Sequence, residues 1–197
     1  SVCSPILANI YMHYILVWWF EECIVPKLKG YGGLVVYADD FVVCFQYKEE
    51  AELFYELLKK RMKIFGLEME ESKTRLIEFG RMAEQNRKAR GERKPETFEF
   101  LGFTHYCSKS RRGWFRVKRK TSKKKFAKKC RELSQTMRAM RTWRLTDIFR
   151  KTNQILIGYY HYYGITDNGK SLQRMKRKVE NLLFYWLNHR SQKRSYN

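Results

Sequence analysis

Residues 34–45 read LVVYADDFVVCF, and this stretch decides how the first part of the chain folds. Two β-rich segments, 34–37 and 41–45, flank the adjacent Asp39 and Asp40, which predicts a β-hairpin with both carboxylates at its tip. Aspartate is common in hairpin turns, so a purely structural role is one explanation of the pair. The other is that the tip holds hard oxygen ligands for Mg²⁺ at a phosphoryl-transfer site. Because successive strand side chains point to opposite faces, we expect Asp39 to contribute more to metal binding than Asp40.

Helical patterns precede and follow this hairpin. The pair Ser4 and Pro5 predicts a helix start with Ser4 as the N-cap, and the helix itself is expected to be largely buried over residues 5–23. Residues 48–65 place apolar side chains at helical spacing. They predict an amphipathic helix that packs on the sheet and ends at Gly66.

Short strands and then helices are predicted in the rest of the chain. The expected strands are residues 67–69, 75–79, 98–101, 103–106 and 114–118. The expected helices are residues 121–141, 145–163 and 171–189. A turn is predicted at 70–73 and a polar surface loop without periodicity at 81–96. The fold class is therefore α+β, with a mixed domain over residues 1–107 and a basic helical domain over residues 108–197.

The positive charge of the chain is concentrated in its second part. The 197 residues include 41 Lys and Arg against 20 Asp and Glu, for a net charge of +21. Residues 1–80 carry a net charge of −3 and residues 81–197 one of +24. Between Lys109 and Arg144, 16 basic residues stand against the single acid Glu132 and are interleaved with aromatic residues. This mixture predicts a nucleic-acid partner, with a solvated basic surface as the alternative.

In the basic part of the chain, residue spacing distinguishes side chains expected in the core from side chains expected to contact nucleic acid. Within 121–141, apolar residues at spacings of four and three form a stripe that we assign to the core, namely Phe126, Cys130, Leu133, Met137 and Met140. Cationic residues elsewhere on this helix and just before it are expected to contact nucleic acid. They are Arg112, Lys118, Lys120, Lys123, Lys124, Lys128, Arg131, Arg138 and Arg141.

Composition excludes several other classes of protein. A hydrophobic content of 44% can build a core, so the chain is not expected to be globally disordered. The apolar run from Ile15 to Phe20 is far shorter than the roughly 18 residues that a membrane span requires. Five scattered cysteines without a C-x-x-C pair argue against a disulfide framework and a structural zinc site. They are typical of a reducing compartment, and we expect a cytoplasmic location.

Several segments occur in an order that resembles the reverse transcriptases of bacterial group II introns. Four resemble palm motifs of that family: SPILANIY at 4–11, YADD at 37–40, GLEM-x₃-KT at 66–74 and FEFLGF at 98–103. Two more, ILIGYYHYYG at 155–164 and LNHRSQKRSY at 187–196, are similar to its maturase-specific region. The resemblance implies a partial polymerase palm, an antiparallel sheet with packed helices, over 1–107. A helical thumb and maturase-specific domain would follow over 108–197.

The resemblance also implies roles for individual residues. Asp39 and Asp40 would hold the catalytic metal, two Mg²⁺ ions in the intact enzyme, with Mn²⁺ as a possible replacement. Residues near the incoming nucleotide and template would be Ser4, Pro5, Asn9, Tyr37 and Ala38. Lys73 would act catalytically at the triphosphate, although a solvated turn lysine is the simpler explanation. The primer end would be gripped by Phe100, Leu101 and Gly102, for which core packing is the alternative.

The function implied is RNA-directed DNA synthesis combined with maturase activity in intron splicing and mobility. The partners would be group II intron RNA, an RNA template, a DNA primer and deoxynucleoside triphosphates, with no membrane. One alternative is an RNA-binding splicing cofactor without polymerase activity, and another is a reverse transcriptase of a host pathway. The family takes a further catalytic aspartate from an upstream strand, and no aspartate precedes Asp39 here. We therefore expect a truncated chain that is inactive alone.

Overall fold

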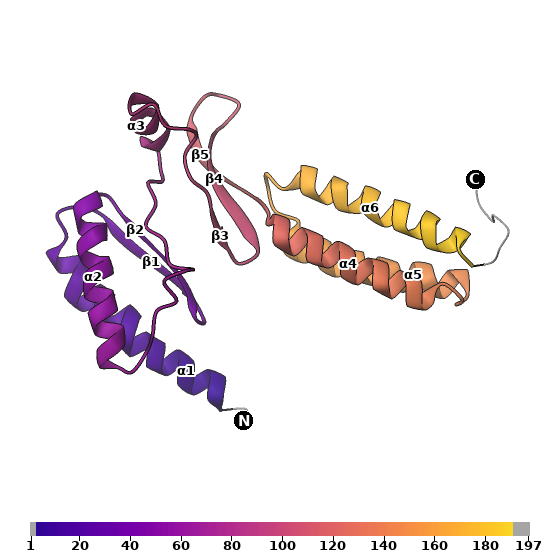
Figure 1. The fold of residues 1–197 in the computed structure, drawn as a ribbon, viewed down its shortest axis with the longest axis horizontal. Coiled ribbons are helices and arrows are strands. Elements are labelled where there is room, and N and C mark those ends of the chain that lie inside the picture. The colour runs from indigo at the N-terminus through magenta and orange to yellow at the C-terminus, as the bar shows by residue number, and fades with distance from the viewer. Residues whose placement is uncertain (1–2, 191–197) are drawn as a thin grey trace. The chain divides into compact units, whose positions relative to one another are not determined.

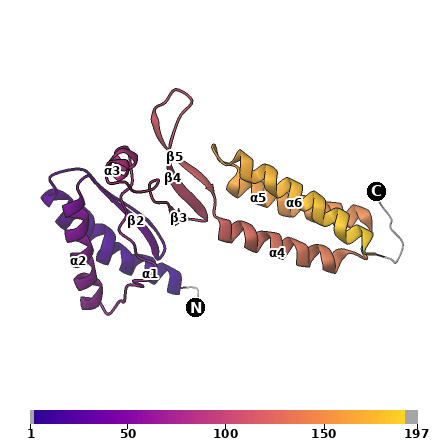
Figure 2. The same cartoon turned by 45° about the horizontal axis from the view of Figure 1, so that its top comes forward.

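The computed structural model describes residues 3–190, which form helices and two small antiparallel sheets (Figures 1 and 2). This confirms the α+β class. Two compact units divide between Glu78 and Phe79 and are described separately. The division lies before the predicted domain boundary because the strands after residue 97 form one sheet that leads directly into the helices. The boundary between functional domains at residues 107 and 108 stays a prediction.

The first unit packs a hairpin and a helix around the end of its N-terminal helical segment. Its elements are α1 (Ser4–Met12), π-helical segments His13–Trp18 and Phe20–Ile24, a 3₁₀ turn Val25–Lys27, β1 (Gly32–Tyr37), β2 (Asp40–Phe45) and α2 (Lys48–Ile64). The core joins side chains of the π-helical region to one stripe of α2: Ile15, Leu16, Trp19, Phe20, Ile24, Phe54, Leu58 and Met62. The predicted hairpin and amphipathic helix are thus confirmed.

The expectations for the N-terminal helix were wrong in two respects. The described residues from Cys3 to Tyr11 are all exposed, and burial begins only at Ile15, so half of the helix lies outside the core. Ser4 is not the N-cap. Cys3 already has helical dihedral angles, φ −77° and ψ −21°, and it takes the cap position, so Ser4 is the first helical residue. A capping serine requires the extended backbone that this continuation removes.

Helix α2 ends just before Gly66, as the glycine in the sequence predicts. Gly66 has a φ of 69°, the left-handed region that glycine adopts without steric cost. The N–H of Leu67 donates to Met62 O at 2.9 Å, and the N–H of Gly66 donates to Lys63 O at 3.1 Å. These two bonds form a Schellman motif, which satisfies carbonyls left unpaired by the last turn of the helix.

Arg61 from α2 supports the π-helical segment. Its Nε donates to Ile15 O at 2.6 Å and its Nη2 to Tyr14 O at 3.3 Å. The guanidinium also lies 4.8 Å from the centre of the Trp19 ring. A π-helical turn pairs each carbonyl with the N–H five residues on, and the carbonyl oxygen has a second lone pair that can accept from a side-chain donor. Arg61 supplies such donors.

Arg61→Met is therefore expected to lower the free energy of unfolding of the first unit by about 1.5–3 kcal/mol, the value of charged hydrogen bonds to carbonyls. Urea denaturation measures this loss. Lys60→Met, at the exposed neighbouring position, serves as the control. A loss no larger than that of the control would show that Arg61 does not support this segment.

The two short strands predicted after α2 do not form. Residues 67–69 and 75–79 have no regular structure, because β1 and β2 pair only with each other in the described sheets and offer these segments no ladder. Leu67 and Met69 instead pack against the core of the unit. The turn between them is confirmed by bonds from the N–H groups of Lys73 and Thr74 to Glu70 O, both at 3.0 Å.

The second unit combines a three-stranded sheet with three long helices (Figure 1). Its elements are α3 (Ala83–Ala89), β3 (Phe98–Phe100), β4 (Phe103–Lys109), β5 (Phe115–Thr121), α4 (Lys123–Met140), α5 (Leu145–Tyr163) and α6 (Gly169–Asn188). The three helices share a core of Leu133, Met137, Met140, Ile148, Tyr159, Met175, Val179 and Leu187. The predicted helices and core stripe are confirmed, and β5 continues to Thr121, three residues beyond the predicted strand.

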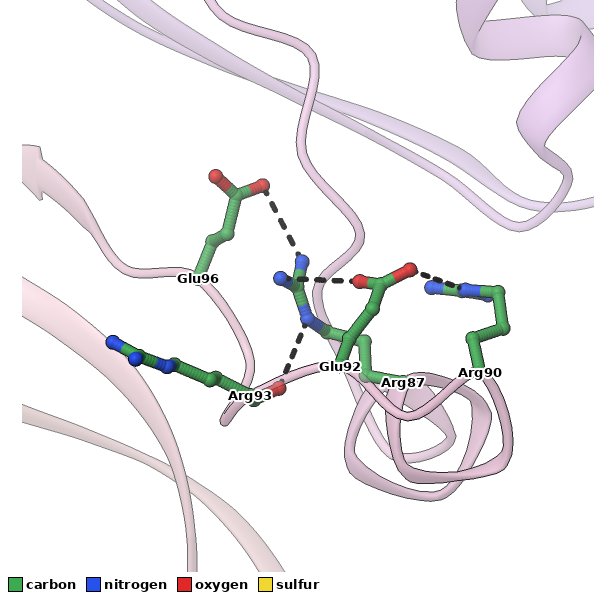
Figure 3. Close-up of polar contacts among 5 residues, drawn as sticks. All are labelled: Arg87, Arg90, Glu92, Arg93 and Glu96. Atoms are coloured by element: carbon green, nitrogen blue, oxygen red, sulfur yellow. Dashed lines mark hydrogen bonds and ion pairs between the residues drawn. The ribbon is translucent and has the colours of Figure 1, made fainter.

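Helix α3 occupies part of the segment predicted as a loop. Figure 3 shows how Arg87, only 19% exposed, joins its end to the following chain: its guanidinium pairs with Glu92 at 3.1 Å and Glu96 at 3.8 Å, and Nε donates to Arg93 O at 3.2 Å. Gly91 ends the helix with a φ of 71° in a second Schellman motif. The helix is stabilised by these charged contacts rather than by an apolar stripe, so hydrophobic periodicity could not reveal it.

Candidate nucleotidyl-transfer site and nucleic-acid interface

The YADD sequence forms the tip of the β1–β2 hairpin. The strands pair antiparallel, with Tyr37 opposite Asp40, which leaves Ala38 and Asp39 as a two-residue turn. Core packing sets the register, since one face of the hairpin contributes Leu34, Val36, Phe41, Val43 and Phe45 to the core of the first unit. A slip of one residue would expose this face, so the carboxylates have a defined place at the tip.

Ala38 adopts a strained backbone conformation in this turn. Its φ is 53°, a value that costs an L residue roughly 1–2 kcal/mol compared with the right-handed region. Glycine would adopt this angle without that cost. Such strain is concentrated at functional sites, where the surrounding structure maintains it. Here the strained residue stands directly before Asp39.

Both carboxylates at the tip are open to solvent. Asp39 and Asp40 are exposed, and neither carboxylate makes an ion pair or hydrogen bond with another residue in the part of the chain that the structure describes. Asp40 shares a strand face with Val42, opposite the face of Phe41 and Val43 that packs on the core. The tip therefore presents two hard anionic ligands that are not paired with any cation of residues 3–190.

Lys73 lies in the same unit as the hairpin, in the turn that follows α2. Its side chain is 80% exposed, and its Nζ lies 3.4 Å from Glu70 Oε2. A hydrogen bond from Ser72, followed by the charge of Lys73, lowers the pKa of the Glu70 carboxyl. No hydrogen bond or ion pair between described residues joins Lys73 to the hairpin. Ser4, Pro5 and Asn9 lie on the exposed α1.

The segment assigned to the primer grip forms a second tight hairpin. Phe100 and Phe103 are paired across the turn, and the two residues between them have positive φ, 49° at Leu101 and 77° at Gly102. Two successive positive angles characterise a type I′ turn, which matches the twist of an antiparallel pair. The turn and the sheet behind it belong to the second unit, next to the helices.

A row of four cationic residues on α4 lies opposite its core stripe. Lys124, Lys128, Arg131 and Arg138 recur at spacings of four, three and seven, two positions before the buried series. Two positions rotate a helix by about 200°, so this row starts from the side of α4 away from the core stripe, and only the Arg138 guanidinium among the four reaches a ring of α6, lying 6.0 Å from the centre of Trp186. None of the nine cations predicted to contact nucleic acid forms an ion pair with an acid within residues 3–190.

Two family comparisons match separate parts of this chain. The family described as "Reverse transcriptase (RNA-dependent DNA polymerase)" matches residues 1–105. The chain belongs to the reverse transcriptase family. The family described as "Group II intron, maturase-specific domain" matches residues 123–197, so the reverse transcriptase is one of the group II intron type. A search among curated proteins gave no match.

These matches confirm the resemblance based on the motifs, and with it the activity class. The protein is an RNA-directed DNA polymerase, a nucleotidyltransferase, with a maturase domain for group II introns. Reverse transcriptases bind RNA and use divalent metal ions. The matched maturase region extends beyond the described residues, so positions 191–196 of the second maturase-like motif lie outside them. No helix in residues 3–190 has the length and apolar character to cross a membrane.

The hairpin of this reverse transcriptase suits a hard divalent cation by its donor chemistry. Mg²⁺ in phosphoryl-transfer sites is held by one or two carboxylates and completes its shell with water and substrate phosphate. Asp39 and Asp40 supply that number of carboxylates. Among the described residues, no group of three or more His, Cys, Asp or Glu side chains is close enough to form a larger metal site.

Sequence patterns missed Asn168, a fully buried residue between α5 and α6 of the reverse transcriptase. Its Oδ1 accepts the N–H of Thr121 at 2.9 Å, and its Nδ2 donates to Tyr163 O at 2.8 Å. Asn168 thus joins the end of β5 to the end of α5. The only sequence signal was a turn-forming Asp-Asn-Gly stretch at 167–169.

Asn168→Ala is expected to lower the free energy of unfolding of the second unit by about 2–3 kcal/mol, because a buried N–H and a buried carbonyl lose their partners. Chemical denaturation followed by circular dichroism provides the measurement. Asn181→Ala, at an exposed position of α6, should change stability by less than about 0.5 kcal/mol. Equal effects of the two variants would rule out this role for Asn168.

Proposed function

We propose that the β1–β2 hairpin holds the catalytic Mg²⁺ of RNA-directed DNA synthesis. The observation that supports this most directly is a pair of exposed carboxylates, without cationic partners in residues 3–190, at the tip of a hairpin whose register is set by core packing. Asp39, in the turn, is the principal ligand and Asp40 the second. Bound there, Mg²⁺ or Mn²⁺ would neutralise phosphate charge and favour attack by the primer hydroxyl.

The neighbouring residues are assigned to the substrates. We propose that Tyr37 and Ala38 lie beside the incoming nucleotide and template, together with Ser4, Pro5 and Asn9 of α1. The Lys73 ammonium, released from Glu70, would meet the triphosphate and stabilise the leaving pyrophosphate. Its exposure of 80% leaves it accessible to such an anion.

We assign the Leu101–Gly102 turn, called the grip turn below, to the primer end. We assign the basic residues of α4 and of the segment before it to the template duplex and to intron RNA. Phe100, Leu101 and Gly102 hold the primer end, and the nine exposed or partly exposed cations between Arg112 and Arg141 contact RNA phosphates. A-form duplexes are recognised mainly through phosphates and 2′-hydroxyl groups, which suits a row of Lys and Arg. We propose that residues 1–107 serve the polymerase and residues 108–197 the thumb and maturase functions. All five cysteines are free, which supports the proposed cytoplasmic location.

Primer extension and splicing assays on the full-length gene product test this proposal together. With an RNA template, a DNA primer, deoxynucleoside triphosphates and Mg²⁺, we expect DNA synthesis that ceases when the metal is chelated. The same preparation should promote splicing of the group II intron RNA associated with its gene. Splicing without any DNA synthesis would instead identify a splicing cofactor that lacks polymerase activity.

A further inference from the structure

The grip turn is attached to the helices of the second unit through both of its carbonyl groups. Tyr162 of α5 donates its hydroxyl to Leu101 O at 2.8 Å. The N–H of Ser122, at the start of α4, donates to Gly102 O at 2.9 Å. Neither residue is a neighbour of the turn in sequence, so the two bonds are tertiary contacts that fix the turn to two separate helices.

Aromatic packing reinforces the same attachment. The Tyr162 ring stacks on Phe103, with ring centres 5.8 Å apart and planes 16° from parallel. Tyr163 meets Phe103 edge-on at 5.2 Å, and a Cβ added to Gly102 would lie 3.0 Å from the Tyr163 hydroxyl. A side chain at position 102 would therefore press on α5, in addition to being strained at a φ of 77°.

The end of α5 is itself held in place beneath this contact. Asn168 accepts the N–H of Thr121 and donates to Tyr163 O, so the last turn of α5 is bonded to the strand that leads into α4. The turn, the end of β5 and the end of α5 thus form one hydrogen-bonded junction. A shift of α5 relative to the turn would break the Tyr162 bond and the ring stack together.

We infer that Tyr162 is a positioning residue that ties the Leu101–Gly102 turn to α5, so that the primer end keeps a fixed place relative to the helices of the second unit. This inference rests on the proposed role of the turn as primer grip. The hydroxyl of Tyr162 acts on the reaction only through the turn. Its loss should misplace the primer end without weakening the binding of the duplex.

Photo-crosslinking from the primer terminus tests the inference without relying on catalysis. A primer ending in 4-thiothymidine is annealed to an RNA template and bound to the full-length gene product without nucleotides. Mass spectrometry then locates the crosslinked peptide, and fluorescence anisotropy gives the Kd for the duplex. Tyr162→Phe retains the ring stack and removes only the hydroxyl. Tyr185→Phe is the matched control, since the two side chains are similarly exposed, 54% and 49%.

We expect the wild type and Tyr185→Phe to crosslink within residues 98–106. Tyr162→Phe should lose most of that crosslink and extend primers about tenfold more slowly, the scale of effect of a small misplacement of reacting groups. Its Kd should stay unchanged, and its melting temperature should fall only slightly, through the loss of one hydrogen bond. Crosslinking by Tyr162→Phe at the wild-type level would overturn the positioning role of Tyr162, while the assignment of the turn as the primer grip would stand. A wild-type crosslink outside this segment would overturn the grip assignment, and the inference with it.

Discussion

Asp39→Ala is expected to reduce RNA-templated DNA synthesis by the full-length gene product on the order of 10³-fold or more, because the variant removes the principal carboxylate ligand of the metal. Asp39 lies in a two-residue turn at the hairpin tip, where no described residue depends on its side chain. The substitution should therefore leave the fold and the affinity for RNA nearly unchanged. Primer extension, Kd and melting temperature measured on one preparation separate these effects.

Alanine variants of two other aspartates test whether this loss of synthesis is specific to Asp39 at the hairpin tip. Asp40→Ala should reduce synthesis less than Asp39→Ala, since we assign Asp40 the secondary role. Asp147→Ala removes a half-exposed acid that pairs with Arg150 on α5, and it should leave synthesis within about twofold. Normal synthesis by Asp39→Ala would show that the reacting metal is held elsewhere. Parallel loss of synthesis and RNA affinity would indicate a folding defect or an RNA contact that depends on metal.

Charge reversal on α4 should act on the affinity for RNA, which Asp39→Ala leaves nearly unchanged. Each phosphate contact contributes a slope of about 0.9 to the logarithmic dependence of duplex affinity on salt, so losing two contacts should weaken binding about 10²-fold at 0.1 M salt. We expect this loss in the Lys124→Glu/Lys128→Glu double variant. The salt dependence should become shallower by about two in slope, because fewer counterions are released on binding.

The matched control is Lys60→Glu/Lys63→Glu, which places the same charge change on exposed positions of α2. Anisotropy titrations of a structured intron RNA at several salt concentrations measure all three proteins. The wild type should lose affinity steeply between 50 and 200 mM salt, as expected for several phosphate contacts. Equal losses in both double variants would mean that the affinity depends on net charge rather than on the α4 row.

Features of the fold that depend on local sequence were predictable. The two hairpins arise from β-rich segments around short turns, and α2 combines an apolar stripe with a terminating Gly66. The core stripe of α4 followed in the same way from its four-and-three spacing, which also placed Lys124 and Lys128 on the opposite face.

Features that depend on distant partners were not predictable. The strands expected at 67–69 and 75–79 had suitable composition but found no neighbouring strand. Helix α3 is stabilised by Arg87 and acids beyond its end, a pattern with no hydrophobic period. At the candidate site, YADD revealed the carboxylates because the motif is contiguous. Tyr162 acquires its relation to the grip turn only through contacts 61 residues apart.

Iron-directed cleavage is the measurement that tests the central claim most directly, because it locates the metal within the chain. Fe²⁺ replaces Mg²⁺ in the complex of full-length gene product, RNA template, primer and nucleotide, and ascorbate with peroxide then generates hydroxyl radicals beside the bound ion. We predict backbone cleavage centred on residues 37–41, suppressed by excess Mg²⁺ and absent in Asp39→Ala. Cleavage at another segment, or cleavage at the hairpin that persists in Asp39→Ala, would contradict the assignment of the metal to this tip.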